Sequence, residues 1–86
     1  MTIESAYLVV PFQRIGKRLG PVQAFMFDAP APARLAAWQL APRVAGVAIL
    51  ERRFDPETGD KDTVVAEIGL VPPAFVEHAD WSVRLH

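Results

Sequence analysis

The sequence predicts an α+β domain in which a small, mostly antiparallel sheet carries one main helix on one of its faces. Residues 47–54 and 63–71 alternate apolar and polar side chains as two strands would, and a turn segment joins them. Between about 30 and 41 the apolar residues recur at helical spacing instead. A chain of 86 residues fits a single domain, 1–86, that buries roughly 60% of its unfolded surface.

Composition excludes several classes of protein and site. Cysteine is absent, so the chain can form neither a disulfide framework nor a thiolate metal site. The formal net charge of −1 argues against a general nucleic-acid binder, although the first half of the chain is net positive and the second half net negative. No run is long enough for a membrane span and the N-terminus lacks a signal-peptide layout, so we expect a cytoplasmic protein. No cofactor is expected.

Two strands are expected before the helix. The apolar run 5–12 is typical of a central strand covered on both sides, and Pro11 should limit its end because proline cannot donate to a ladder. Residues 13–21 combine three basic residues with two glycines, which indicates a basic, flexible loop. The aromatic stretch 22–28 is expected to pair with the first strand.

The helix should begin at about Pro30 or Ala31 and end at about Ala41, or continue to Ala45 with a kink, since Pro42 removes a backbone hydrogen bond and disfavours helical geometry just before it. Proline is tolerated in the first turn, and Asp28 lies where a carboxylate favours the positive helix end. At 100° per residue a stripe of small residues should pack on the sheet, and two bulky residues, Leu35 and Trp38, should point away from it. The stripe comprises Ala33, Ala36, Ala37, Leu40, Ala41 and Val44.

The segment 55–60 is expected to be the turn of a hairpin, because Asp55 can accept from the backbone, Pro56 presets φ and Gly59 permits a positive φ. Regular alternation places Leu50 beside Ala66 or Ile68, so we expect the core on that side.

After Pro72 and Pro73 the chain should form a short helical turn over 73–79 and a terminal strand over 81–86, with Trp81 inward. That strand could pair within the chain or with a second copy. Apart from an extra early strand, the resulting order resembles the split β-α-β arrangement of ferredoxin-like folds. The second crossover, residues 72–80, is short for that arrangement.

His78 is the best acid–base candidate, because Glu77 and Asp80 could orient its imidazole. The sequence offers no partner nucleophile, so an exposed or capping histidine is the favoured interpretation and we expect no catalysis. The carboxylates of the segment 55–62 do not match a calcium loop, and no metal site is expected.

Two surfaces remain as candidates for binding. Leu35, Trp38 and Trp81 are predicted partner-binding residues, because tryptophan in an accessible apolar patch is a common anchor, although the two tryptophans could instead complete one core. Arg14, Lys17 and Arg18 could contact an anion or nucleic acid, although a solvated basic loop is the simpler interpretation.

The leading hypothesis is therefore a non-catalytic interaction or structural module, self-associating or part of a larger assembly, through the outer face of the helix or an open sheet edge. One alternative is an accessory nucleic-acid binder that uses the basic loop 13–20. The other is a small dimeric ferredoxin-like barrel with a ligand or catalytic pocket near His78.

Overall fold

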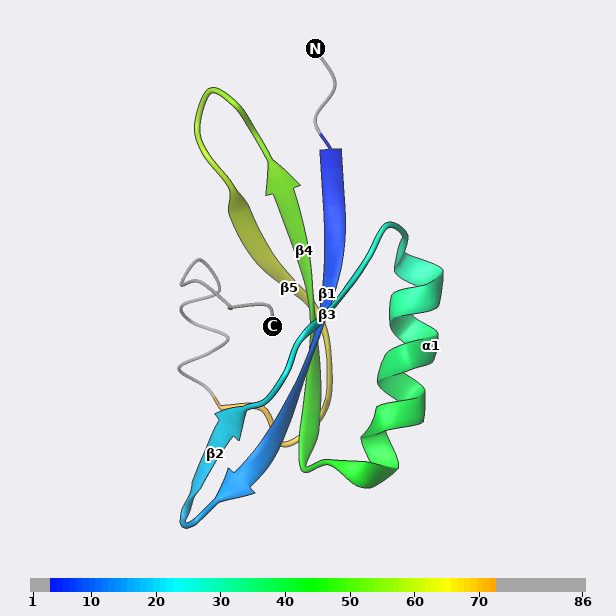
Figure 1. The fold of residues 1–86 in the computed structure, drawn as a ribbon, viewed down its shortest axis with the longest axis vertical. Coiled ribbons are helices and arrows are strands. Elements are labelled where there is room, and N and C mark those ends of the chain that lie inside the picture. The colour runs from blue at the N-terminus through cyan, green and yellow to red at the C-terminus, as the bar shows by residue number, and fades with distance from the viewer. Residues whose placement is uncertain (1–3, 73–86) are drawn as a thin grey trace.

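A computed structural model describes residues 4–72 of the chain (Figure 1). These residues form a five-stranded sheet with one α-helix beside it, which confirms the predicted α+β class. The elements in chain order are β1 (Glu4–Ile15), β2 (Arg18–Pro21), β3 (Phe25–Phe27), α1 (Pro30–Leu40), the 3₁₀ turn η1 (Ala41–Arg43), β4 (Gly46–Phe54) and β5 (Lys61–Gly69).

The long strand β1 is central, as its apolar sequence predicted. It pairs with β4 along one edge and with both β2 and β3 along the other, and β5 continues the sheet beyond β4. Every pairing is antiparallel, so β3 and β4 run parallel to each other with β1 between them. Helix α1 connects these two strands and thus completes a split β-α-β unit. The predicted turn over 73–79 and strand over 81–86, which a full ferredoxin-like fold needs, lie outside the described residues.

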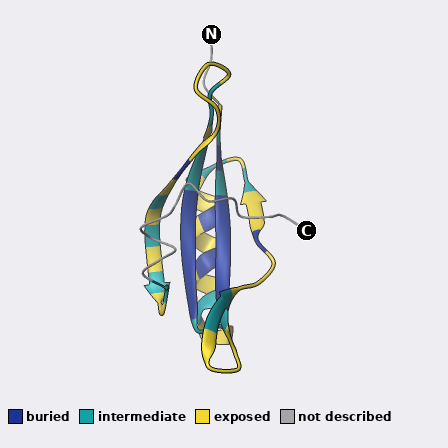
Figure 2. Cartoon of the chain, turned by 90° about the vertical axis from the view of Figure 1, so that its left-hand side faces the viewer, coloured by how far each residue is buried: buried dark blue, intermediate teal, exposed yellow. Residues whose placement is uncertain are grey.

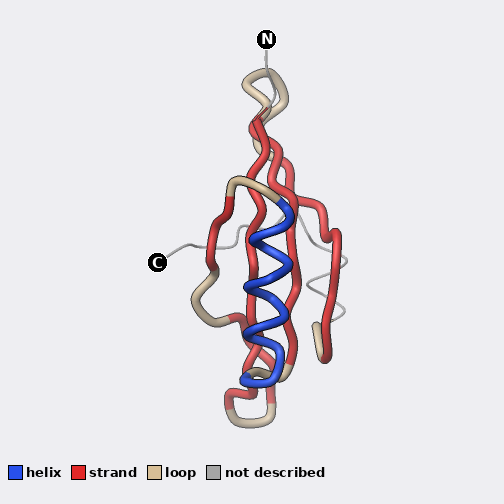
Figure 3. Tube along the Cα trace, turned by 90° about the vertical axis from the view of Figure 1, so that its right-hand side faces the viewer, coloured by secondary structure: helices blue, strands red, loops and turns tan. Residues whose placement is uncertain are grey.

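The sheet is buried on both faces, although α1 covers only one of them (Figures 2 and 3). Side chains alternate between faces along a strand, so neighbouring residues of β1 join different clusters. The cluster under the helix contains Val9, Val47 and Ile49 with Ala33 and Ala37. The cluster on the opposite face contains Leu8, Val10, Phe12, Ala24, Ala48 and Leu50, with Val64 and Val71 against it.

Helix α1 begins and ends where the sequence predicted. Pro30 occupies the first turn, and Ala29 precedes it in an extended conformation. No side chain hydrogen-bonds to this end of the helix, so Asp28 does not act as its cap. The α-helix stops at Leu40 and continues as the 3₁₀ turn that contains Pro42, consistent with the missing donor of proline. The alanine stripe faces the sheet as predicted, because its short side chains allow close approach.

The predicted side of the core was wrong for the β4–β5 hairpin. Ile49 pairs with Ala66 but the next residue, Leu50, pairs with Val64, so Val65 is an extra residue that forms a β-bulge. Because of this extra residue, the side chains of β5 on either side of the bulge switch the face of the sheet to which they point. Ile68 consequently packs under the helix, whereas Leu50 packs on the opposite face.

The predicted basic loop over 13–21 was also wrong. Strand β1 continues through Pro11 to Ile15 and turns at Gly16, whose φ is 65°, into β2. Proline lacks only the backbone N–H donor. The carbonyl oxygen of Pro11 still accepts a hydrogen bond from the Val22 N–H at 2.9 Å. Pro11 therefore does not end the strand.

Candidate interaction surface

The outer face of α1 is an exposed apolar surface. Leu35 is 60% exposed and Trp38 69% exposed, whereas Ala33 and Ala37 on the inner face are fully buried. The two bulky residues are three positions apart, which puts them on one side of a helix. The structure thus places Leu35 and Trp38 where the sequence predicted, and the alanine stripe is the physical reason that they point outward.

Beside this face lies a groove of about 550 Å³ between β3 and α1. Phe25 and Phe27 form its wall on β3, and Leu40 belongs both to the groove and to the cluster under the helix. The residues that line the groove are Phe25, Phe27, Ala36, Gln39, Leu40 and Arg43. The described lining is therefore mostly apolar, and within it Arg43 is the charged residue.

A smaller pocket of about 220 Å³ lies on the other flank of the helix, lined by Tyr7, Pro30, Arg34, Ile49, Glu51, Val65 and Ala66. The Tyr7 hydroxyl donates a hydrogen bond to Oε2 of Glu51, with 3.1 Å between the oxygens. This hydrogen bond raises the pKa of Tyr7, so the phenol is neutral at physiological pH. A neutral phenol is a poor nucleophile.

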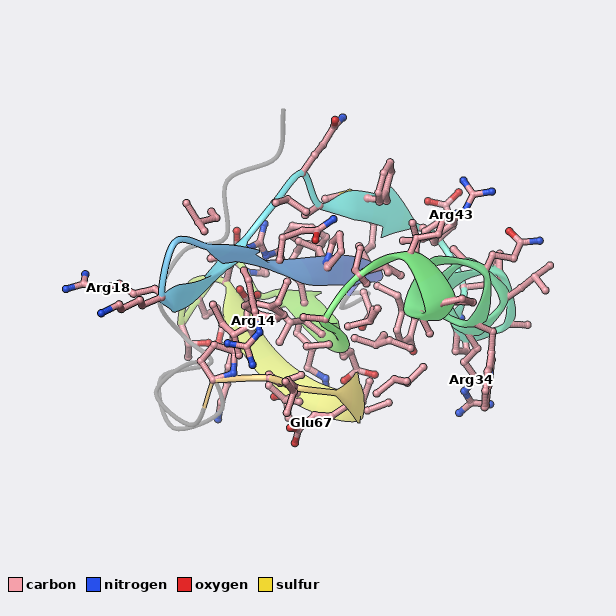
Figure 4. All side chains as sticks on the ribbon, turned by 90° about the horizontal axis from the view of Figure 1, so that it is seen from below. Arg14, Arg18, Arg34, Arg43 and Glu67 are labelled. Carbon is pink, nitrogen blue, oxygen red and sulfur yellow. The ribbon has the colours of Figure 1, made fainter. Side chains whose placement is uncertain are left out.

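Figure 4 shows Arg34 and Arg43 on opposite flanks of the helix. Arg43 lies on the flank of the larger groove and Arg34 on the flank of the smaller pocket. The outer face of α1 is thus bordered by a positive charge on each side.

Several charged side chains of the β4–β5 hairpin have structural partners. Nε and Nη2 of Arg52 donate to the two carboxylate oxygens of Asp62 at 2.7 and 2.9 Å, and this bond raises the pKa of Arg52. The Asp55 carboxylate accepts from the Glu57 N–H at 2.9 Å, which lowers the pKa of Asp55 and closes the turn as predicted. Among residues 4–72 no three acidic or histidine side chains converge as metal ligands would.

The predicted anion-binding residues lie at the β1–β2 hairpin. Arg14, Lys17 and Arg18 are all exposed there, and Arg18 is directed away from the sheet (Figure 4). The ordered hairpin replaces the flexible loop expected from two glycines.

Two other predicted residues cannot be placed on this surface. Trp81, predicted to bind a partner, and His78, the acid–base candidate, lie outside the described residues.

Comparison with known proteins identified no relative of this chain. The sequence matches no family model, and no curated protein or solved structure was found to be similar to it. Helix α1, with 11 residues, is too short to cross a bilayer, and the described part of the chain contains no helix suited to do so.

Sequence reasoning missed the groove, the Tyr7–Glu51 hydrogen bond and the Arg52–Asp62 ion pair. Both pairs depend on the strand register, because Tyr7 lies directly opposite Glu51, and Arg52 directly opposite Asp62. Tyr7 and Glu51 are also far apart in the sequence. Arg52 and Asp62 flank the same turn, and their opposite charges were the available signal for that pairing.

Proposed function

We propose that the chain is a non-catalytic interaction module that self-associates through the outer face of α1. The exposure of Trp38, 69%, is the observation that carries this proposal. Tryptophan is the residue type most enriched at binding hot spots, and its large apolar surface gains most from leaving water. Leu35 extends the same surface by one helical turn.

The free energy expected from burying the Trp38 side chain supports an anchoring role for this residue. Burying about 150 Å² of apolar tryptophan surface contributes roughly 4 kcal/mol at 25 cal/mol per Å². A stable interface needs about 800 Å² on each partner, so surface beside the two bulky residues must take part as well. The flank of the helix that carries the smaller pocket, beside β5, provides such surface.

The outer edge of β5, which no strand of the described part of the chain covers, is a weaker candidate for self-association than the helix face. The bulge at Val65 breaks the regular spacing of its backbone groups, and the exposed charges of Lys61 and Glu67 lie on the same strand. Bulges and charged side chains are features by which edge strands avoid pairing with another copy. We therefore favour the helix face over the sheet edge.

Sedimentation velocity across micromolar concentrations tests the proposal. The wild-type chain should form a dimer or larger species, and Trp38→Ser should shift it to monomer with an unchanged far-ultraviolet circular dichroism spectrum. Ile15→Ser is the matched control, because Ile15 is 63% exposed at the distant β1–β2 hairpin, and it should leave association unchanged. A wild-type chain that is monomeric throughout, or equal effects of the two substitutions, would refute self-association through this face.

Nucleic-acid binding is the second candidate, favoured by the exposure of Arg14, Lys17 and Arg18 on one hairpin. Phosphate contacts make such binding strongly salt-dependent. The wild-type chain should then retard a single-stranded oligonucleotide at low salt, and reversing the three charges should abolish retardation. Absence of retardation at low salt rejects this candidate.

A further inference from the structure

Within residues 4–72, strand β3 has one edge that pairs with no other strand. It pairs with β1 through Tyr7↔Phe27, Leu8↔Met26 and Val9↔Phe25, and no described strand lies along its other edge. The backbone N–H and C=O groups on that edge can pair with an added extended chain. At three residues β3 is short, so a chain added there needs side-chain contacts as well.

The groove beside β3 supplies those contacts. Its volume of about 550 Å³ lies in the range of natural ligand sites, and its wall includes Phe25, which is 40% exposed. In an extended chain alternate side chains point to the same face. A strand added to β3 would therefore direct every second side chain over the groove and toward Leu40.

The charge at the groove favours an acidic occupant. Arg43 lines the groove, and within residues 4–72 its guanidinium has no ion pair. Among the described residues that line the groove, none is acidic. A guanidinium binds a carboxylate through two parallel hydrogen bonds, which gives both affinity and orientation.

We propose that this groove binds an extended acidic peptide segment of a partner protein, which adds a strand to β3, seats an apolar side chain against Phe25 and Leu40, and pairs a carboxylate with Arg43. This site goes beyond self-association through the outer helix face, because neither Leu35 nor Trp38 lines the groove. The two proposals can therefore fail independently.

Fluorescence anisotropy with the intact chain tests the charge preference. The probes are three fluorescein-labelled peptides of equal length that alternate leucine with serine and end in two glutamates, two lysines or two glutamines. The glutamate peptide should bind most tightly and the lysine peptide most weakly. Equal affinity for all three, or no binding of the glutamate peptide, overturns the proposal.

Two arginine substitutions locate the carboxylate contact. Arg43→Gln should weaken binding of the glutamate peptide by up to about fivefold, the value of one exposed ion pair, and should leave the glutamine peptide unaffected. Arg34→Gln is the matched control, because Arg34 lies on the opposite flank of the same helix (Figure 4), and it should change neither affinity. Equal effects of both substitutions indicate general electrostatic attraction and overturn the proposed site.

Amide hydrogen exchange tests strand addition. The N–H groups of β3 that face away from β1 should exchange more slowly when the glutamate peptide is bound, and those of β5 should not change. Trp38→Ser should leave peptide binding intact whether or not it alters oligomeric state. If Phe25→Ala instead abolishes self-association and peptide binding is absent, the occupant is a second copy and the peptide proposal is wrong.

Discussion

Removing the carboxylate of Asp62 is expected to destabilise the fold strongly. The side chain of Asp62 is 5% exposed and that of Arg52 16% exposed, and two short hydrogen bonds join them across β4 and β5. In Asp62→Ala the guanidinium keeps its charge but loses both acceptors. The cost therefore comes from a partly buried charge left without a partner.

The loss of stability expected for Asp62→Ala lies between two limits. Exposed ion pairs contribute about 0–1 kcal/mol, whereas removing one partner of a fully buried pair costs about 3–5 kcal/mol. Arg52 retains some access to water and can turn partly toward it, so we expect a loss of about 2–3 kcal/mol in the free energy of unfolding. For a domain of this size that loss lowers Tm by roughly 10–20 °C.

Urea denaturation followed by circular dichroism measures the loss. Glu57→Ala is the control, because Glu57 is exposed in the neighbouring turn and its side chain should contribute within about 0.5 kcal/mol. The double variant Arg52→Leu/Asp62→Leu should recover at least half of the loss, since apolar residues often replace a buried pair at little cost. If Asp62→Ala is no more destabilising than Glu57→Ala, the buried-charge reasoning is refuted.

Three further predictions concern the packing and the turn. Gly46→Ala should cost about 3 kcal/mol or more in a urea titration, because the new Cβ would lie 2.5 Å from the Leu70 carbonyl carbon and closer still to its oxygen, and both are backbone atoms. Ala37→Leu should cost about 1–3 kcal/mol because Ala37 is fully buried against the sheet, whereas Ala31→Leu, exposed on the same helix, should be nearly neutral in the same titration. The pKa of Asp55 is lower in the folded than in the unfolded state, so its contribution to stability is present above the unfolded pKa of about 3.9 and is lost as pH falls through the folded value. Urea midpoints measured between about pH 6 and 2 should therefore fall more steeply for the wild type than for Asp55→Asn, and parallel curves would contradict this prediction.

The candidate surface illustrates how far sequence reasoning reached. The outward position of Leu35 and Trp38 followed from helical periodicity, because the alanines on the other side fix which face can approach a sheet. The groove did not follow, since Phe25 and Leu40 line it together only when β3 has joined the sheet and α1 has packed on the face of that sheet.

The same division holds for the fold. The sequence by itself determined the hairpin turn at Asp55, the limits of the helix and the central place of the first strand, because local geometry governs each of them. Proline fixes φ and lacks a donor, glycine permits a positive φ, and a run of alanines permits close packing.

Only the tertiary structure decided the register of β5 and the path of β1. Whether Val65 bulges depends on which arrangement best buries the residues of β4 on both faces, and this is a property of the whole sheet. Whether Pro11 ends a strand depends on whether the adjacent strand has an acceptor that requires the missing N–H. Here the adjacent segment instead donates to the carbonyl oxygen of Pro11. These choices involve pairings between distant segments, which are decided by packing rather than by local preference.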